Sequence, residues 1–548
     1  MNSISRFTSR ISLYQWILVG ILVLAAFIRL YQSTQYIPFW EEQVDDMLSI
    51  RQTWQNISTG NIKNLALKGQ SGTYRTSYLQ PKELTPVYHG VAYYYLLLPA
   101  AVIAQFNPYG VVLFLICLGL ISVYLLYDAG YLLFRDRVIG LIAAFLGATS
   151  FWLSAYSRWI WTPSMVPFFS LLSLVSFLRV LEGKKTWWFP LVISLALGSQ
   201  VHDSGYVPFV FFYGALLVYR PKLPIGLWSR VWLLILGLGP IVPTFINEIS
   251  EGFRMTRSLS VVAYNAVPTM TTIAESLLRF IKIAMGMTIM SQKYIDASVT
   301  LLMKYVWVLF IAILVVWIIT VVFRKILPAQ KIFRRKNSSL QISYKALIIS
   351  WWIMCFPVSV LVEYLYADQV LNDYSRMNNL VFALPMVFLC VACICVVLWR
   401  RYHMIGRVVV TIGLVIFLGF NMVIIRDYLW RYTERDWAYQ DLKTVSWLVP
   451  HLAGEEPYDL VAYRYQEGSY ESKNVYVMLY FIELYPARMP ERFNGGLQWG
   501  VTKEVLRGQS ARQHFIVMDK RYKGIRDLPQ GANLVGQTEG YEVYRWVD

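Results

Sequence analysis

The sequence predicts an α-helical polytopic membrane protein with about eleven spans, followed by a small C-terminal α/β domain. Three observations predict this fold class. Of the 548 residues, 57% are hydrophobic, which is more than a soluble chain of this size hides from water. Several apolar runs reach the roughly 20 residues that cross a bilayer. The Lys and Arg residues behind the net charge of +17 gather between these runs, as the positive-inside rule expects, so the charge does not indicate nucleic-acid binding.

The predicted spans follow one another from the N-terminus. The first lies at 14–30, and Arg6 and Arg10 before it place the N-terminus in the cytoplasm of a plasma-membrane protein. This run is long enough to remain as a span, so no cleaved signal is predicted. The remaining spans are expected at 111–134, 138–156, 164–180, 187–203, 206–219, 231–247, 301–323, 345–363, 379–399 and 407–425. Each loop that this order places inside is net positive, which supports it.

Two long outside loops interrupt the membrane-embedded part, 1–425, at 31–110 and 248–300. The first contains an apolar-aromatic run at 88–99 that could be read as a further span. We expect an interfacial helix there, because a span would invert every later loop and break the charge rule.

The composition changes near residue 426, where polar residues become frequent. Strand-like runs are expected at 458–463, 474–484, 515–518 and 541–547. The segment 426–548 is therefore predicted to be an α/β domain on the outer side of the membrane.

Four carboxylates, Glu41, Glu42, Asp45 and Asp46, follow the first span. On a helix, Glu42 and Asp46 share one face, and Glu41 and Asp45 share the neighbouring face. One interpretation is a solvated helix start that favours acids. The other is a general base at the membrane surface, where an apolar surrounding raises the pKa of a carboxyl group.

Further polar residues lie at the outer ends of predicted spans. Arg158 either extends to lipid headgroups or binds a phosphate through its planar fork, and Thr162 is a hydroxyl beside it. His202 is either a structural hydrogen-bonding group or a phosphate contact or proton relay. Arg254 and Arg257, three residues apart, either bind a phosphate together or lie on an amphipathic surface helix that binds anionic headgroups, and Arg376 is a further candidate substrate-binding residue. The motifs HExxH, GxxxxGK[ST] and GxSxG are absent, which argues against a zinc protease, a P-loop ATPase and a serine hydrolase of that fold.

The order of these motifs resembles the bacterial branch of the protein mannosyltransferase and aminoarabinose transferase group, in the glycosyltransferase C superfamily. The resemblance covers about residues 15–430. An acidic motif after the first span is matched by Glu42-Gln43-Val44-Asp45-Asp46, with Glu42 where Asp is usual. The other matches are Gly90-Val91-Ala92-Tyr93-Tyr94-Tyr95, with Val91 where Pro is usual; Ser157-Arg158-Trp159-Ile160-Trp161-Thr162-Pro163, with Thr162 where Asn is usual; Gln200-Val201-His202; and Glu248 to Phe253 with Thr256.

The resemblance implies an inverting glycosyltransferase that moves a sugar from a polyprenyl-phosphate donor to a hydroxyl of a protein, lipid or glycan acceptor outside the cytoplasm. Glu42 or Asp46 would be the general base, and cationic residues would stabilise the departing lipid phosphate. Some relatives use a divalent metal ion near the acidic motif, but we assign no metal ligands. Two alternatives stay open, a transporter or lipid flippase and a scaffold without catalysis. The expected substrate-binding residues are Glu41, Asp45, Tyr93, Tyr94, Arg158, Thr162, His202, Arg254, Arg257 and Arg376.

Overall fold

The structure is a computed structural model that describes the N-terminal half of the chain, one late helical pair and five C-terminal strands. The described residues are 12–33, 37, 41–69, 71–74, 85–223, 226–253, 256, 351, 381–426, 458–463, 504–506, 513–519, 533–537 and 541–547. The predicted spans at 301–323 and 345–363, the strand expected at 474–484, and Arg254, Arg257 and Arg376 lie outside the described residues.

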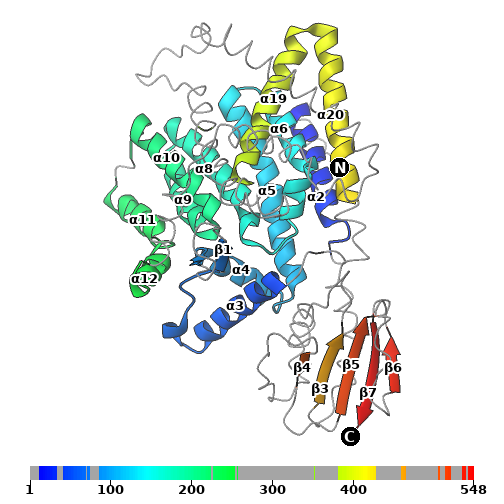
Figure 1. The fold of residues 1–548 in the computed structure, drawn as a ribbon. Coiled ribbons are helices and arrows are strands. Elements are labelled where there is room, and N and C mark those ends of the chain that lie inside the picture. The colour runs from blue at the N-terminus through cyan, green and yellow to red at the C-terminus, as the bar shows by residue number, and fades with distance from the viewer. Residues whose placement is uncertain are drawn as a thin grey trace, which may run out of the picture.

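The protein is a helical polytopic membrane protein. Among the described helices, five are long and apolar enough to cross a membrane, or six if one bent pair counts as a single span. These are α2 (Leu13–Leu30), α5 (Pro108–Phe134), α8 (Val166–Leu181) with its preceding 3₁₀ turn, α19 (Leu384–Arg401), α20 (His403–Ile425) and the pair α11 (Leu227–Leu238) and α12 (Val242–Ser250). Helix α5 lies in the middle of the bundle and packs against α2, α6 (Arg137–Thr149) and α8 (Figure 1).

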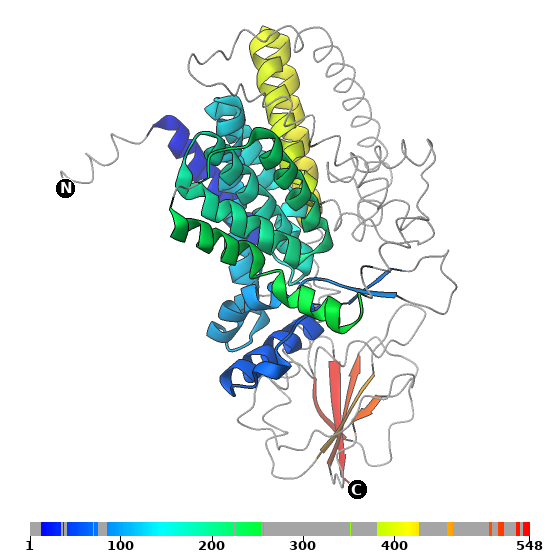
Figure 2. The ribbon, with the colours of Figure 1, turned by 90° about the vertical axis from the view of Figure 1, so that its left-hand side faces the viewer.

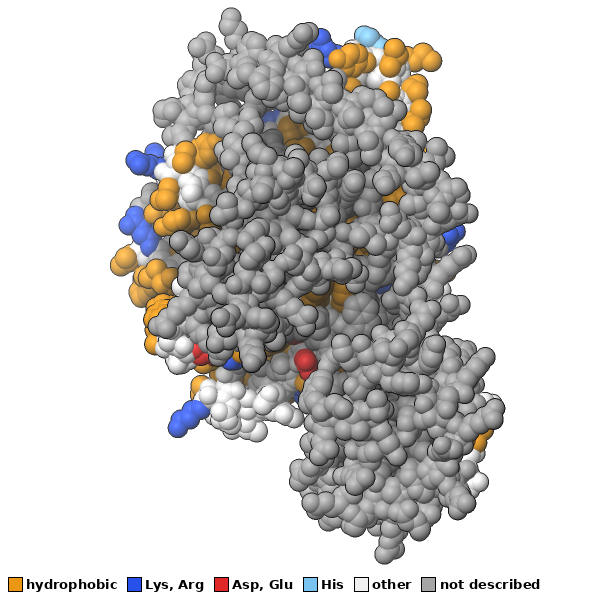
Figure 3. Space-filling view, in the orientation of Figure 1, with side chains coloured by type: hydrophobic (Ala, Val, Ile, Leu, Met, Phe, Trp, Pro, Cys, Tyr) orange, Lys and Arg blue, Asp and Glu red, His pale blue; other side chains and the backbone are white. Residues whose placement is uncertain are grey.

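Exposed apolar side chains gather along the left edge and at the upper right of the view in Figure 3. Leu234 and Ile235 of α11 and Ile412 and Val415 of α20 are all exposed. Such surfaces are unfavourable in water and suit contact with lipid. The packed interior is formed by the opposite faces of the same helices, together with α9 (Trp188–Val201) and α10 (Tyr206–Tyr219).

Two of the predicted spans are broken where the sequence analysis expected continuous helices. The run 138–156 forms α6 and then α7 (Phe151–Tyr156), because Ser150 is extended and its hydroxyl caps α7 by accepting from the amide of Leu153. The side chain of Asn421 accepts from the amide of Phe151 at 2.8 Å. The run 231–247 forms α11 and α12, which are bent by 49° around Gly239 and Pro240, since proline cannot continue the hydrogen-bonding pattern of a helix.

The first long loop forms helices and a hairpin at one end of the bundle (Figures 1 and 2). Helix α3 (Glu41–Ser58) packs against α4 (Ala92–Ile103), and β1 (Ser71–Tyr74) pairs antiparallel with β2 (Thr85–Tyr88). Helix α4 has 12 residues, about 18 Å at 1.5 Å per residue, and a bilayer core is about 30 Å thick. It is therefore too short to span, as expected for an interfacial helix.

The C-terminal strands form one five-stranded sheet in the order β4-β3-β5-β7-β6. These are β3 (Tyr458–Tyr463), β4 (Glu504–Leu506), β5 (Gln513–Asp519), β6 (Asn533–Gln537) and β7 (Tyr541–Val547). Strands β3 and β5 are parallel and the other neighbours are antiparallel. A parallel pair requires a crossover connection, which is typical of α/β structure. Both ribbon views show the sheet beyond the end of the bundle that carries α3.

The two ends of the bundle differ in charge. At one, the basic end, Arg400 pairs with Asp136 at 2.5 Å, Arg135 pairs with Glu182, and the Trp188 indole donates to the carbonyl of Lys222. These contacts join the loops that the sequence analysis placed in the cytoplasm. The other end, the carboxylate end, is defined by Asp46, Asp203, Glu248 and Glu251.

Candidate functional site

The acidic stretch forms the start of α3, and the helix buries one of its acids. Val44, Met47 and Ile50 are fully buried and form an apolar stripe against α4, and Asp46 is 0% exposed beside them. Asp45, one residue earlier, is exposed. Glu41 and Glu42 are the first residues of α3, and their side chains lie outside the described part of the structure.

Two tyrosines of α4 surround the buried Asp46 carboxylate. The hydroxyl of Tyr94 donates to Oδ1 of Asp46 at 3.1 Å, and the Tyr93 and Tyr94 rings lie 6.1 Å apart. Burial and the negative charge of Asp46 raise the pKa of both phenols, so both hydroxyls stay protonated. The Tyr93 hydroxyl is also buried and has no hydrogen-bond partner among the described residues. The structure thus brings together three of the predicted site residues, Asp46, Tyr93 and Tyr94.

A pair of histidines whose rings are tilted by 31° joins the first long loop to the turn between α9 and α10. The rings of His89 and His202 lie 4.8 Å apart, and Nδ1 of His89 is 3.2 Å from Oδ1 of Asp203. Nδ1 of His202 accepts from the amide of Ser204 at 3.1 Å, so a neutral His202 carries its proton on Nε2. Burial and the neighbouring His89 lower the pKa of His202 to about 3. His202 is therefore a neutral donor at neutral pH.

The sequence analysis missed His89. The sequence signal that could have identified His89 is its position directly before Gly90, the first residue of a segment that matches the family pattern. Gly90 lies against the end of α9 so closely that a Cβ atom there would be 2.4 Å from the carbonyl oxygen of Gln200. The amide of Gly69 donates to the carbonyl of His89 at 2.8 Å. The residues on both sides of the hairpin are thereby held against the bundle.

Helix α12 closes the carboxylate end with two glutamates. Glu251 forms an ion pair with Lys68 at 2.8 Å, and the Lys68 ammonium also lies 3.9 Å from the centre of the Tyr88 ring. Glu248 is 6% exposed, and its Oε2 accepts from both the amide and the hydroxyl of Thr256. Lys68, Glu248 and Glu251 were not among the predicted site residues.

Arg158 and Thr162 lie at the junction of α7, α8 and the end of α2. The Arg158 guanidinium is fully buried and donates to the carbonyls of Tyr31 at 3.1 Å and Gln32 at 3.2 Å. Carbonyls at the end of a helix lack intrahelical donors, so Arg158 fixes the point where the chain leaves α2 toward α3. The buried hydroxyl of Thr162 has no partner among the described residues. The roles predicted for both residues in substrate binding stay predictions.

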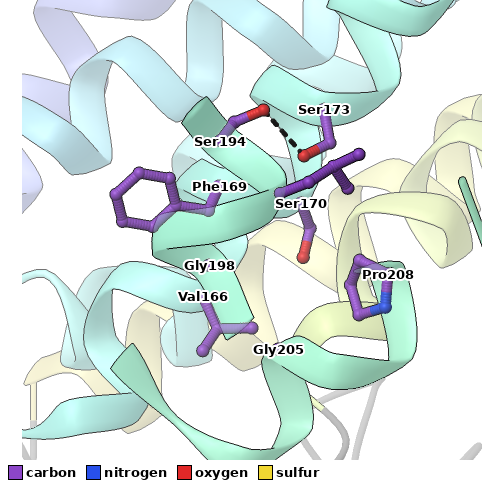
Figure 4. A pocket seen from close by; sticks show the side chains of 9 residues that line it. Val166, Phe169, Ser170, Ser173, Ser194, Gly198, Gly205 and Pro208 are labelled. Atoms are coloured by element: carbon purple, nitrogen blue, oxygen red, sulfur yellow. Dashed lines mark hydrogen bonds between the residues drawn. The ribbon is translucent and has the colours of Figure 1, made fainter. Parts of the chain in front are cut away.

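A small pocket lies between α8, α9 and α10 (Figure 4). Its volume is about 10 Å³, which is close to the room that one water molecule needs. The hydroxyls of Ser173 and Ser194 hydrogen-bond at 2.9 Å across it, and Gly198 and Gly205 let the helices approach closely. It is too small for a sugar or a prenyl chain and is separate from the carboxylates described above.

The described residues form no group of three His, Cys, Asp or Glu side chains that suits a metal ion. We therefore derive no step through a metal. The divalent ion considered from the sequence stays a prediction.

Comparison with known proteins gives structural matches only. No protein-family model and no curated protein matches the sequence. The structure is similar to ArnT from Cupriavidus metallidurans in the apo state, with 11% identity, 96% of this chain and 97% of that chain covered, and a TM-score of 0.41. The same enzyme bound to undecaprenyl phosphate matches at 12% identity, with 97% and 98% covered and a TM-score of 0.40.

The archaeal oligosaccharyltransferase AglB from Archaeoglobus fulgidus, in complex with an inhibitory peptide and a dolichol-phosphate, is also similar. It matches at 13% identity over 89% of this chain and 61% of that chain, with a TM-score of 0.35. The chain is thus similar over nearly its whole length to ArnT, and over most of its length to AglB.

Proposed function

We propose that this protein is a membrane glycosyltransferase that moves a sugar from a polyprenyl-phosphate donor to an acceptor hydroxyl, with inversion at the anomeric carbon. The single observation that carries the proposal is the buried Asp46 carboxylate, oriented by Tyr94 at one end of a membrane bundle. A general base must be held in place and kept from bulk water, and it must be able to accept a proton from a hydroxyl group. Asp46 meets these requirements, and Glu42 stays the alternative base.

The leaving group in this reaction is a lipid phosphate, which needs hydrogen-bond donors and positive charge. His202 presents a neutral Nε2–H donor, and His89, paired with Asp203, adds a group that can be cationic at the same end. Arg158 remains a predicted contact, since its guanidinium lies where the chain turns from α2 toward α3. Arg254, Arg257 and Arg376 remain predicted phosphate contacts, and Glu41 and Asp45 remain predicted substrate-binding residues.

The membrane orientation follows from charge. The positive-inside rule places the basic end in the cytoplasm and the carboxylate end outside, where a flipped lipid-linked donor presents its sugar. This arrangement includes about eleven spans over residues 1–425 and puts the domain 426–548 outside, where it can cover the site or receive the acceptor. The prenyl chain would lie against the apolar faces of the spans.

Substitution of the two candidate bases tests the proposal. Asp46→Asn keeps the volume and an acceptor for the Tyr94 hydroxyl but removes the basic carboxylate, as Glu42→Gln does at the alternative position. We expect one of them to lower sugar transfer from undecaprenyl-phosphate-linked sugars in nanodiscs by about 100-fold or more, the usual contribution of a general base. The matched control is Gln52→Ala, on the exposed side of the same helix.

The two variants should retain binding of undecaprenyl phosphate. Full transfer activity in both variants would show that neither group is the base. Movement of lipid across the bilayer by the wild-type protein, without any glycosylated product, would instead favour the transporter or flippase.

A further inference from the structure

Glu248 is a buried carboxylate with unused hydrogen-bonding capacity. Its side chain is 94% buried, being 6% exposed. Oε2 accepts from the Thr256 amide at 3.1 Å and from the Thr256 hydroxyl at 2.7 Å. Oε1 accepts from no group in the described part of the chain. A buried carboxylate oxygen without a donor is costly.

Glu251, which directly follows the last residue of α12, is an example of a structural carboxylate in this part of the protein. Glu251, three residues after Glu248, is neutralised by Lys68 at 2.8 Å, and this hydrogen bond is the main cause that raises the pKa of Lys68. Glu248 forms no ion pair with a basic residue of the described segments. Thr256 satisfies the hydrogen-bonding capacity of Oε2 of Glu248. Oε1 can therefore accept a hydrogen bond from a ligand.

A hydrogen-bonded network begins one turn before Glu248 and joins α12 to α9 and α10. Thr244 of α12 donates to Oε1 of Gln200 at 2.5 Å. Nε2 of Gln200 in turn donates to the Tyr206 hydroxyl at 3.0 Å. Because the Tyr206 oxygen already accepts from Gln200, its own proton is left to donate.

The Glu248 carboxylate on α12 supplies an acceptor, and Tyr206, joined to the same helix through Gln200 and Thr244, supplies a donor. Such a pair matches the edge of a sugar ring. Adjacent sugar hydroxyls each donate one hydrogen bond and accept others. A bare phosphate would be repelled by the carboxylate, and a prenyl chain would leave Oε1 without a donor. The chemistry of the site therefore favours a group that carries hydrogen-bond donors, such as the hydroxyl groups of a sugar.

We propose that Glu248 and Tyr206 form a subsite for hydroxyl groups of the sugar carried by the lipid donor. This assignment rests on the proposed glycosyltransferase function and adds to it the residues that recognise the sugar. Glu248 is a specificity-determining residue in this scheme, while Gln200 and Thr244 position Tyr206. The predicted result is preference for a glycosylated carrier over the same carrier without its sugar.

The test compares binding of two kinds of lipid to purified protein in nanodiscs. One probe is bare undecaprenyl phosphate, and the other is a panel of undecaprenyl phosphates that carry mannose, glucose, galactose or arabinose. We expect the wild-type protein to bind at least one glycosylated probe more tightly than the bare lipid. In Glu248→Gln, which can still accept from Thr256, that probe should bind at least 10-fold more weakly, while the bare lipid binds as before.

Ser250→Ala is the matched control, because it removes an exposed hydroxyl from the same helix outside the proposed subsite. It should leave both affinities unchanged. Equal weakening of both probes in Glu248→Gln would reveal a merely structural residue, and an unchanged preference would remove Glu248 from the subsite. A wild-type protein without any preference also overturns the assignment. The proposed function fails separately, if the wild-type protein binds the lipids but transfers no sugar.

Discussion

Replacement of Gly90 by alanine tests whether the contact between the first long loop and α9 positions the candidate site. Gly90 lies directly after His89 and shortly before Tyr93 and Tyr94. A Cβ atom at this position would be 2.4 Å from the carbonyl oxygen and 2.6 Å from the Cα atom of Gln200. Both are backbone atoms of a helix, so they cannot turn aside as a flexible side chain would.

The size of the effect follows from these distances. An ordinary contact of a Cβ atom begins near 3.4 Å, so the loop must move away from α9 by about 1 Å. Overpacking of this kind costs about 1–3 kcal/mol of stability. The same displacement carries His89 away from His202 and shifts α4 relative to Asp46. A 1 Å misplacement of reacting groups lowers turnover by roughly 100-fold.

The assay measures sugar transfer and thermal unfolding on the same protein in nanodiscs. Gly90→Ala should lose turnover by roughly 100-fold and unfold at a lower temperature. Gly214→Ala is the matched control, because no atom lies within 4 Å of a Cβ built there and alanine favours the helix. Wild-type turnover in Gly90→Ala would refute the reasoning, since it would show that the position of the loop does not matter for the reaction.

Two further predictions concern the buried side chains of His202 and Arg29. His202 is held neutral with a pKa of about 3 against 6.5 for a free histidine, so the unfolded chain takes up a proton first as the pH falls. Stability is complete above pH 6.5 and should drop by about 2 kcal/mol at pH 5, a slope that His202→Gln removes in denaturant titrations. The fully buried Arg29 donates to the carbonyls of Gly147 and Ala148 at the end of α6. Arg29→Met should lower the free energy of unfolding by about 3 kcal/mol, whereas the exposed Arg401→Met should not, and equal midpoints would contradict the capping role.

Hydrophobic runs predicted most of the described helices because length and apolarity are local properties. They did not predict the break at Ser150, where the Ser150 cap is supported by a hydrogen bond from the Phe151 amide to Asn421, far along the chain. The bend between α11 and α12 was readable from Gly239 and Pro240, two residues that interrupt a helix. Helix breaks were thus predictable where the cause is the residue itself, and not where the cause is a distant partner.

The same distinction applies to the site. The sequence indicated an acidic stretch but left Glu42 and Asp46 as alternatives. The apolar residues Val44, Met47 and Ile50 indicate which side of α3 faces the protein interior, and this side includes Asp46 but not Asp45. The helical periodicity of these residues therefore predicts one buried carboxylate. His89 has no periodic signal, because it lies between a strand and a helix and its partners come from another loop.

The contacts of the first long loop show that residues far apart in the sequence together position the candidate site. Hydrophobic spans place a segment at the right depth in the membrane but leave its lateral position free, since lipid contacts are not directional. Direction comes from the polar contacts, His89 with Asp203 and Lys68 with Glu251, and from the close approach of Gly90 to Gln200. Each of these joins the loop to α9 or α12 rather than to the first span. The position of Asp46 therefore depends on helices that lie much later in the chain. Substitutions at the end of α9 should displace Asp46 as strongly as substitutions in α3.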